Sequence, residues 1–164
     1  MAFILDKSIH NSDWVSREMT GGTGSGTLAG VNFSASTTHA LRATAWLASH
    51  PGADAVLGRE MARKLKIPPD YLSKVLATLA RSGVLTAVRG ARGGYRLARA
   101  PERIRLVEVV TPFEGRRARS GCLLRPDRPC RNSGHCSAHT AWAGVNDAYR
   151  SFLEKTTVAD IRDG

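Results

Sequence analysis

The sequence predicts a mainly α-helical fold with one small β-hairpin, and three observations lead to this prediction. Apolar residues recur at helical spacing in separate segments between Ser34 and Glu154. β-Forming residues surround an Arg/Gly-rich stretch at 89–94, which is typical of a hairpin with a glycine-rich tip. A long segment near the C-terminus carries apolar residues along one side, as an amphipathic helix does.

The first two helices are expected before the double proline of the chain. The helical pattern begins at Ser34 with a stripe of small apolar residues, and it ends at His50-Pro51-Gly52. A shorter helix is expected over residues 57–65, where Met61 and Leu65 lie on one side.

The third helix has the clearest signals in the sequence. It is predicted over residues 69–81, because proline is tolerated in a first turn and Asp70 can cap the free amides there. Gly83 is expected to follow its end in the left-handed conformation. Apolar side chains recur at the spacing of a core-facing stripe, at Leu72, Val75, Leu76 and Leu79.

The hairpin and two more helices complete the predicted order. The first strand contains Val84, Thr86 and Val88, and the return strand contains Tyr95 and Leu97. A short helix is expected over residues 104–113, with Leu106, Val109 and Val110 facing inward. The last helix is expected over residues 138–154, and its apolar positions are Trp142, Val145, Tyr149, Phe152 and Leu153.

The chain is strongly basic, with a net charge of +10 and an isoelectric point near 10.4. The positive charge is concentrated between residues 89 and 105, where six arginines stand against the single acid Glu102. Such an excess indicates an anionic partner, most often nucleic acid, rather than a basic surface without a partner. No apolar run approaches the length of a membrane span.

Helix, short helix, turn, helix and hairpin is the order of a winged helix-turn-helix. In that fold the helix at 69–81 lies in the major groove and the hairpin forms the wing. The expected DNA-binding residues are Tyr71, Ser73, Lys74 and Arg81 on the helix, and Arg89, Gly90, Arg92, Gly93 and Gly94 at the wing. A plain turn and an RNA-binding disordered tail are the alternatives for the Arg/Gly-rich stretch, and the flanking β-forming residues argue against the tail.

The three cysteines of the chain and one histidine fall in a short stretch with the spacing C-x7-C-x5-C-x2-H. These residues are Cys122, Cys130, Cys136 and His139. Three thiolates and an imidazole suit an iron–sulfur cluster or another thiophilic metal. Structural zinc and bare redox-active thiols remain open, because Cys₃His also binds zinc and the neighbouring arginines favour thiolates. An odd number of cysteines argues against an intrachain disulfide framework and favours the cytoplasm.

Several stretches resemble the bacterial winged-helix transcriptional regulators of the Rrf-two family, which includes the iron–sulfur and nitric-oxide sensors IscR and NsrR. The matching stretches are THALRATAWLA, IPPDYLSKVLATLARSGVLTAVRGARGGYRLAR, RLVEVVTPFEG and CSAHTAW. The resemblance covers residues 36–161. It implies a homodimer that pairs through the helix around Trp142–Leu153 and binds a palindromic operator in double-stranded DNA.

The resemblance also implies a [2Fe–2S] or [4Fe–4S] cluster held by the three cysteines. His139 is expected as the fourth ligand. Some relatives use a carboxylate of the first helix instead, and the corresponding residue here is Thr38, a poor ligand, with His39 beside it as a weaker candidate. The x7 gap between the first two cysteines departs from the gap of about x5 in the best-known sensors.

The sequence thus predicts a sequence-specific transcriptional regulator, acting as a repressor, whose DNA affinity depends on a cluster that senses nitric oxide, redox state or iron status. The alternatives are a cluster-free regulator with thiol-based or zinc-stabilised sensing, and a Cys₃His zinc protein that binds RNA. No phosphate loop, HExxH or G-x-S-x-G motif occurs, so no enzyme is expected.

The predicted organisation has four parts. Residues 1–33 form a disordered N-terminal extension or are not translated, since residues 21–30 have a Gly/Thr/Ser-rich linker composition and relatives begin near Val31. Residues 34–113 form the DNA-binding domain, 114–137 the cysteine-containing metal or cluster loop, and 138–164 the dimerisation helix and C-terminal tail.

Overall fold

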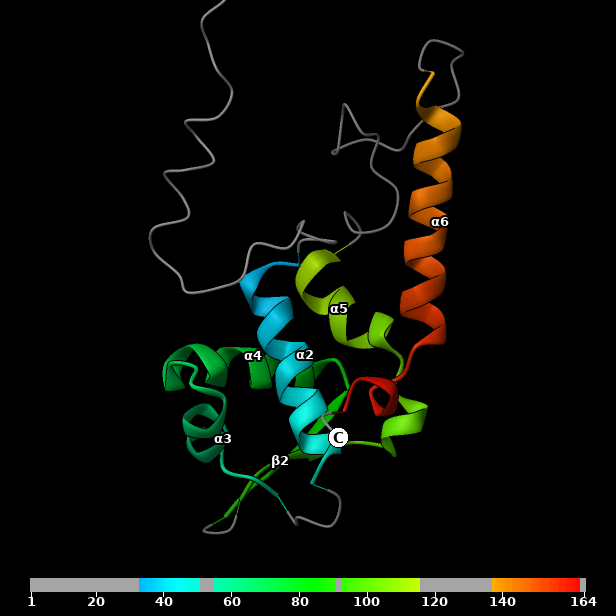
Figure 1. The fold of residues 1–164 in the computed structure, drawn as a ribbon. Coiled ribbons are helices and arrows are strands. Elements are labelled where there is room, and N and C mark those ends of the chain that lie inside the picture. Colours follow the sequence, from blue (N-terminus) through cyan, green and yellow to red (C-terminus); the bar gives the residue numbers. More distant parts are fainter. Residues whose placement is uncertain (1–32, 51–54, 91–92, 116–136, 163–164) are drawn as a thin grey trace, which may run out of the picture. The chain divides into compact units, whose positions relative to one another are not determined.

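The computed structural model describes residues 33–50, 55–90, 93–115 and 137–162, which belong to one compact unit, Phe33–Gly164 (Figure 1). The helices are α2 (Ala35–Ala48), α3 (Gly58–Leu65), α4 (Pro69–Arg81), α5 (Leu106–Glu114) and α6 (His139–Lys155). The strands are β1 (Leu85–Val88) and β2 (Gly94–Leu97), and short 3₁₀ turns cover Pro101–Arg103 and Ala159–Ile161. The predicted class, mainly helical with a small hairpin wing, is therefore confirmed.

Local signals set the ends of the first helices. The Ser34 hydroxyl accepts a hydrogen bond from the Thr37 amide and so caps α2. Helix α3 is followed by its C-cap residue Lys66, whose φ of 55° lies in the left-handed region. The short α3 therefore turns sharply into Ile67, which is buried, and the chain enters α4 through two prolines.

Helix α4 has the predicted bounds, but one predicted capping residue was wrong. The residue before the helix is Pro68, and the Asp70 side chain makes no capping hydrogen bond. Asp70 lies within the first turn instead, where its negative charge still suits the positive end of the helix dipole. Gly83 follows the helix with a φ of 77°, as predicted.

The core lies where α2 packs against α4 and α5. Helix α2 contributes small side chains, and Ala40 and Ala43 are fully buried, so neighbouring helices can approach closely. The larger fully buried side chains are Met61, Leu72, Leu76, Leu79, Val84, Ile104, Val109, Val110 and Val158. The core-facing residues predicted for α4 and α5 are all buried.

The hairpin is antiparallel, and its pairing runs from Leu85 opposite Leu97 to Val88 opposite Gly94. Val56, which precedes α3, adds a short bridge to Tyr95 on the other edge of β2. Gly94 permits this bridge, because a Cβ there would lie 2.2 Å from the Val56 carbonyl oxygen. The wing is thus joined directly to the segment that leads into the helix-turn-helix.

The carboxyl end of α6 is fastened to the segment that leads into α5. The backbones of Arg105 and Thr157 form an antiparallel bridge. The Leu106 amide donates to the Thr156 carbonyl and the Val158 amide donates to the Ile104 carbonyl, both at 2.9 Å. Helix α5 begins at Leu106, two residues later than predicted, because Ile104 is held in extended backbone by this pairing.

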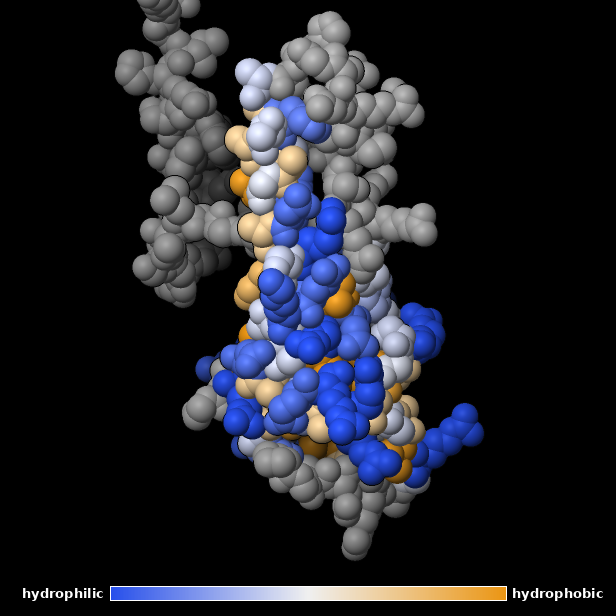
Figure 2. Space-filling model, turned by 90° about the vertical axis from the view of Figure 1, so that its right-hand side faces the viewer, coloured by the Kyte–Doolittle hydropathy of each residue, from blue (hydrophilic) through white to orange (hydrophobic). Residues whose placement is uncertain are grey.

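Two different faces of α6 carry apolar residues. Leu153 is buried against the core and Tyr149 packs beside it, whereas Val145 and Phe152 are 55% and 50% exposed. In Figure 2 apolar residues follow one edge of α6, with hydrophilic residues beside them. The single stripe predicted from the sequence is therefore divided between the core and the surface. In the part of the chain that the structure describes, no helix has the length and hydropathy needed to cross a bilayer.

Candidate nucleic-acid interface

The outer face of α4 presents the side chains that the sequence predicted for DNA. Tyr71, Ser73, Lys74 and Arg81 are exposed, while the leucines and valine of the same helix are buried. Thr78 donates to the Lys74 carbonyl at 3.0 Å and accepts from Arg81 Nη2 at 3.0 Å. The contact with Thr78 holds the Arg81 guanidinium beside the helix while the residue stays exposed.

Tyr71 is held from outside its own helix. Its hydroxyl lies 2.7 Å from the Ser36 hydroxyl oxygen of α2, within hydrogen-bonding distance. The ring of His39, also on α2, meets the Tyr71 ring edge-on, with centroids 5.4 Å apart and planes at 83°. Burial, with a smaller contribution from the charge of Arg42, lowers the pKa of His39, so its neutral form is favoured.

The described part of the wing tip has the shape that glycine alone allows. Gly90 has a φ of 113°, and the Gly93 amide donates to the Gly90 carbonyl at 2.9 Å. A Cβ at Gly93 would lie 2.4 Å from the Val88 carbonyl oxygen. Arg89 is exposed beside this turn, and Arg92, the second predicted arginine of the tip, lies outside the described residues.

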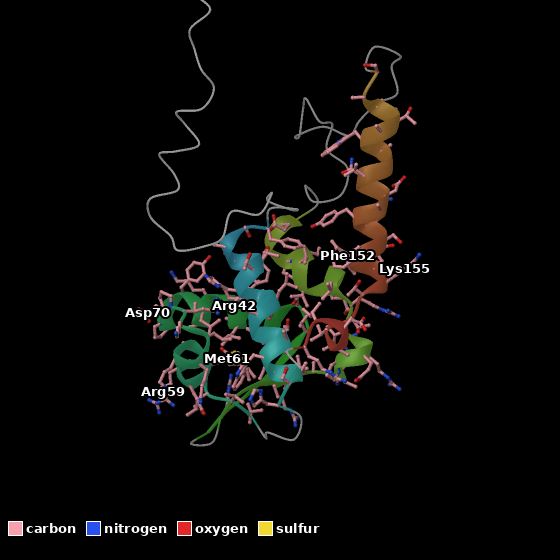
Figure 3. All side chains as sticks on the ribbon, viewed as in Figure 1. Arg42, Arg59, Met61, Asp70, Phe152 and Lys155 are labelled. Atoms are coloured by element: carbon pink, nitrogen blue, oxygen red, sulfur yellow. The ribbon has the colours of Figure 1, made fainter. Side chains whose placement is uncertain are left out.

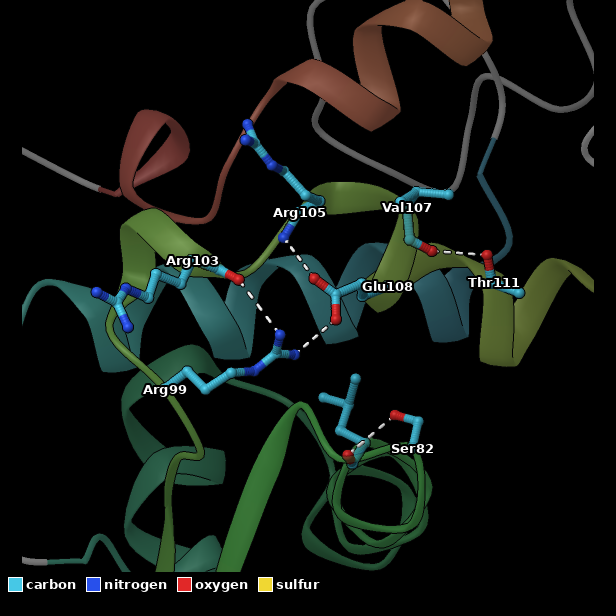
Figure 4. Close-up of polar contacts among 8 residues, drawn as sticks. Ser82, Arg99, Arg103, Arg105, Val107, Glu108 and Thr111 are labelled. Atoms are coloured by element: carbon cyan, nitrogen blue, oxygen red, sulfur yellow. Dashed lines mark hydrogen bonds and ion pairs between the residues drawn. The ribbon is translucent and has the colours of Figure 1, made fainter.

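Not all the arginines of the basic run are available to a partner. Arg99 forms an ion pair with Glu108 at 2.6 Å and also donates to the Arg103 carbonyl (Figure 4). Arg105 donates to the Lys155 carbonyl at 2.7 Å and so supports the end of α6. Burial raises the pKa of Glu108, but hydrogen bonds from Arg99 and the Arg105 amide outweigh it and hold the pKa below its ordinary value.

One further basic residue at this surface was missed from the sequence. A shallow pocket lies between the start of α3, the first turn of α4 and β2, and it is lined by Leu57, Gly58, Arg59, Pro69, Asp70, Ser73 and Tyr95. Arg59 is exposed there, at the outer side of the helix-turn-helix (Figure 3). In the sequence, Arg59 could have been noticed from its place at the start of the predicted second helix. Its nearness to Ser73 is seen only in the structure. Arg42, by contrast, has a structural role, because it donates to the Leu65 carbonyl at 2.7 Å.

The predicted cluster ligands are only partly within the described residues. Cys122, Cys130 and Cys136 lie outside them, in the segment that connects α5 with α6. His139 is the first residue of α6, at the positive end of the helix dipole. The described ranges alone contain no group of three His, Asp or Glu side chains that could hold a metal. The donor set of three thiolates and an imidazole suits an iron–sulfur cluster chemically.

The two candidate ligands on α2 differ in their surroundings. Thr38 is exposed. The Nδ1 atom of His39 is buried and has no hydrogen-bond partner among the described residues, and its ring packs on Tyr71. This packing gives His39 a place in the contact between α2 and α4.

Known proteins resemble the chain in sequence and in fold. A family profile described as "Rrf2: Iron-dependent Transcriptional regulator" matches residues 33–164. A protein of Aquifex aeolicus is 32% identical over 130 residues, which cover 79% of this chain and 90% of that protein. The HTH-type transcriptional regulator NsrR of Shouchella clausii is 30% identical over 125 residues, covering 76% of this chain and 84% of that protein.

Solved structures share the fold. IscR of T. potens superposes with a TM-score of 0.63 at 26% identity, covering 80% of this chain and 86% of that one. CymR of B. subtilis, described as a global cysteine regulator, superposes with a TM-score of 0.66 at 22% identity, covering 80% and 96%. The exposed α4 face, the wing and these matches together lead to one conclusion: the chain belongs to the Rrf2 family of transcriptional regulators, which bind DNA and are not enzymes.

Proposed function

We propose that the protein is a sequence-specific repressor whose affinity for its operator depends on an iron–sulfur cluster that responds to nitric oxide, redox state or iron status. The observation that carries this proposal is the arrangement of the chain. An exposed polar face on α4 and an arginine-bearing wing belong to the same compact unit as the two helices that bound the cysteine segment. We propose that this unit combines a DNA-reading surface with a set of thiol ligands.

The proposed contacts with DNA come from three elements. Helix α4 enters the major groove and offers Tyr71, Ser73, Lys74 and Arg81 to base edges and phosphates. The wing offers Arg89, Gly90, Arg92, Gly93 and Gly94, and arginine suits the negative potential of a narrow minor groove. Arg59, at the start of α3, is added as a phosphate contact, because it is exposed beside Ser73 and β2.

The proposed cluster is a [2Fe–2S] or [4Fe–4S] group held by Cys122, Cys130, Cys136 and His139. When bound, such a group supplies a metal–sulfur centre that nitric oxide or oxygen can modify. The three cysteines would join the end of α5 to the start of α6, and His139 would donate its imidazole from the first turn of α6. A zinc site or bare redox-active thiols at the same residues are the alternatives, and each would take the place of the iron–sulfur cluster.

We also propose a homodimer that pairs through α6 and binds a palindromic operator in the cytoplasm. Ala141, Val145, Ala148 and Phe152 recur at spacings of four, three and four, and all are exposed. Such a seam suits a helix that pairs with another helix and supports the proposed dimer. Two-fold symmetry would set two α4 helices about one turn of DNA apart, roughly 34 Å.

An anaerobic preparation tests the proposal. The purified protein is expected to be coloured, to contain iron and sulfide, and to bind a duplex from its own promoter more tightly than a scrambled duplex at the same salt concentration. Exposure to nitric oxide should then change the affinity for the promoter duplex. Cys130→Ala should remove the visible absorption. A colourless protein that contains zinc, or equal affinity for both duplexes, would overturn the proposal.

A further inference from the structure

We propose that Glu114, the last residue of α5, positions Tyr71 of α4 through the first turns of α2. Glu114 is thereby a positioning residue for DNA reading, and it links α4 to the point where the cysteine-bearing segment begins. The inference rests on the proposed function in one respect, that Tyr71 contacts the operator.

The first contact joins Glu114 to the amino end of α2. Glu114 Oε1 accepts a hydrogen bond from the Ser34 amide at 2.9 Å and another from the Thr37 hydroxyl. Burial raises the pKa of Glu114, but the hydrogen bonds from Thr37 and Ser34 outweigh it and hold the pKa below its ordinary value. An ionised carboxylate is therefore held at the positive end of the α2 dipole, where negative charge is favourable.

The second contact joins the same turns of α2 to α4. Ser36 and His39, which interleave with Ser34 and Thr37 along the helix, hold the hydroxyl and the ring of Tyr71. These α2 residues lie within about two turns of α-helix, a length that moves as one body. A displacement of α2 at Glu114 must therefore displace the groups that hold Tyr71.

The contact between His39 and Tyr71 leaves one buried polar atom of His39 without a hydrogen bond among the described residues. This atom is Nδ1, and a buried unpaired nitrogen costs free energy. Separation of α2 from α4 would let water reach this atom. The contact thus depends on ring packing and on the Ser36 hydroxyl.

The amino end of α2 contacts both helices that bound the cysteine segment, because Ser34 and Thr37 bond to Glu114 of α5 and Phe33 packs near Tyr149 of α6. Glu114 ends α5, and Gly115 follows with a φ of 62°. Burial, and then the negative charge of Glu114, raises the pKa of Tyr149 on α6. The Phe33 ring, directly before the α2 cap, lies 6.2 Å from the Tyr149 ring. The amino end of α2 is therefore the place where a change between α5 and α6 reaches α4.

A matched control exists on the same helix. Glu108 is a second half-buried carboxylate of α5, and its pKa is lowered in the same way. Its hydrogen bonds join it to Arg99 and to the Arg105 amide, neither of which belongs to α2. Glu108→Ala and Glu114→Ala change the net charge equally, so the net charge alone has the same effect in both. Glu108→Ala also releases Arg99, and for this reason the comparison uses the preference for one duplex over another, in which a sequence-independent contact cancels.

Fluorine NMR tests the link without DNA. The protein has three tyrosines, and 3-fluorotyrosine labels them all, with each signal assigned by a Tyr→Phe variant. The Tyr71 signal is expected to move in Glu114→Ala and Ser36→Ala and to stay in place in Glu108→Ala. If Glu114→Ala does not fold, Thr37→Val replaces it, because valine keeps the shape of threonine and removes one donor to the carboxylate. An unmoved Tyr71 signal in the folded variant would overturn the proposal.

Affinity measurements separate the failure of this inference from that of the proposed function. Each variant is titrated with the promoter duplex and with a scrambled duplex, in cluster-loaded and metal-free form. Glu114→Ala should reduce the preference for the promoter about fivefold or more, with a smaller difference between the two forms. Glu108→Ala should retain the preference for the promoter and the difference between the two forms. Glu114→Gln should also retain them, because the amide keeps an acceptor oxygen.

Two outcomes distinguish the claims. If the wild-type protein does not discriminate between the two duplexes, the proposed function fails. If the wild-type protein discriminates but Glu114→Ala and Glu108→Ala behave alike, the proposed function stands and the link through α2 fails.

Discussion

The backbone amides of Val56 and Tyr95 each donate to the other's carbonyl, at 2.9 and 2.8 Å. This pair of hydrogen bonds joins β2 of the wing to Val56, which only Leu57 separates from the start of α3. The wing and the helix-turn-helix are therefore one rigid surface at this point, although they are separate in sequence. Its integrity depends on Gly94, the residue next to Tyr95.

Gly94→Ala should destabilise the protein by about 2 kcal/mol, because the added Cβ meets the Val56 carbonyl oxygen at 2.2 Å in a backbone with a φ of 157°. Urea unfolding measures the change. Gly144→Ala is the control, since its Cβ meets nothing within 4 Å in the described part of the chain and alanine favours helix. Equal stability of the two variants would contradict the role assigned to Gly94.

Arg89→Ala should weaken binding to every duplex and lower the slope of log affinity against log salt by about 1, as expected for the loss of one phosphate or groove contact. Fluorescence anisotropy over a series of salt concentrations measures both quantities. Arg162→Ala removes the same charge from an exposed pair with Glu102, 4.0 Å away, and should leave the slope unchanged. A slope that responds equally to both changes would indicate net charge alone.

Val145→Glu should convert the proposed dimer into monomers, because a carboxylate would be desolvated in the apolar seam of α6. Sedimentation equilibrium gives the mass of each species. Glu154→Gln alters the opposite side of the same helix and should leave the dimer intact. A monomeric wild-type protein, or a dimer that tolerates Val145→Glu, would exclude pairing through this face.

Stability should fall as the pH is lowered from about 7 to 5, partly because of His39. Its pKa is lower in the fold than in the unfolded chain, where it is near 6.5, so the unfolded state takes up the proton first and is favoured as the pH drops. Urea midpoints across this range measure the loss. His39→Leu should flatten the dependence, and an unchanged pH profile in that variant would show that other groups cause it.

Below about pH 5, carboxylates determine how the stability of the fold depends on pH. Glu108, Glu114 and Asp160 have pKa values below their ordinary range, so their contribution is complete at neutral pH. This stabilisation should be lost as the pH falls below about 4.3 and passes through the pKa values that the carboxylates have in the folded state. Glu114→Gln should be less stable than the wild type at pH 7 and should lose less on acidification.

Local signals made the helix-turn-helix predictable. Prolines before α4 and a glycine after it define its ends in any context, and the spacing of its leucines defines its buried face. The expected cap at Asp70 failed because proline already occupies the position before the helix. The late start of α5 was not predictable, because it depends on Ile104 pairing with Val158, far along the chain.

Long-range contacts also explain what the sequence could not show at the candidate site. The basic run suggested six similar arginines, but Arg99 and Arg105 are engaged by Glu108 and the Lys155 carbonyl. The division of α6 into a core-facing and an exposed apolar side depends on where α5 lies. The roles of all the proposed DNA-binding residues and cluster ligands remain predictions, and Arg92 and the three cysteines also lie outside the described ranges.

The bridge between Arg105 and Thr157 fixes the carboxyl end of α6, which would be the pivot of any rotation of this helix. The helix has 17 residues and is about 25 Å long. A rotation of roughly ten degrees at the pivot would therefore swing His139 through about 4 Å, a distance comparable to the rise of one helical turn. The length of α6 would thus convert a small angular change at its carboxyl end into a larger displacement at His139.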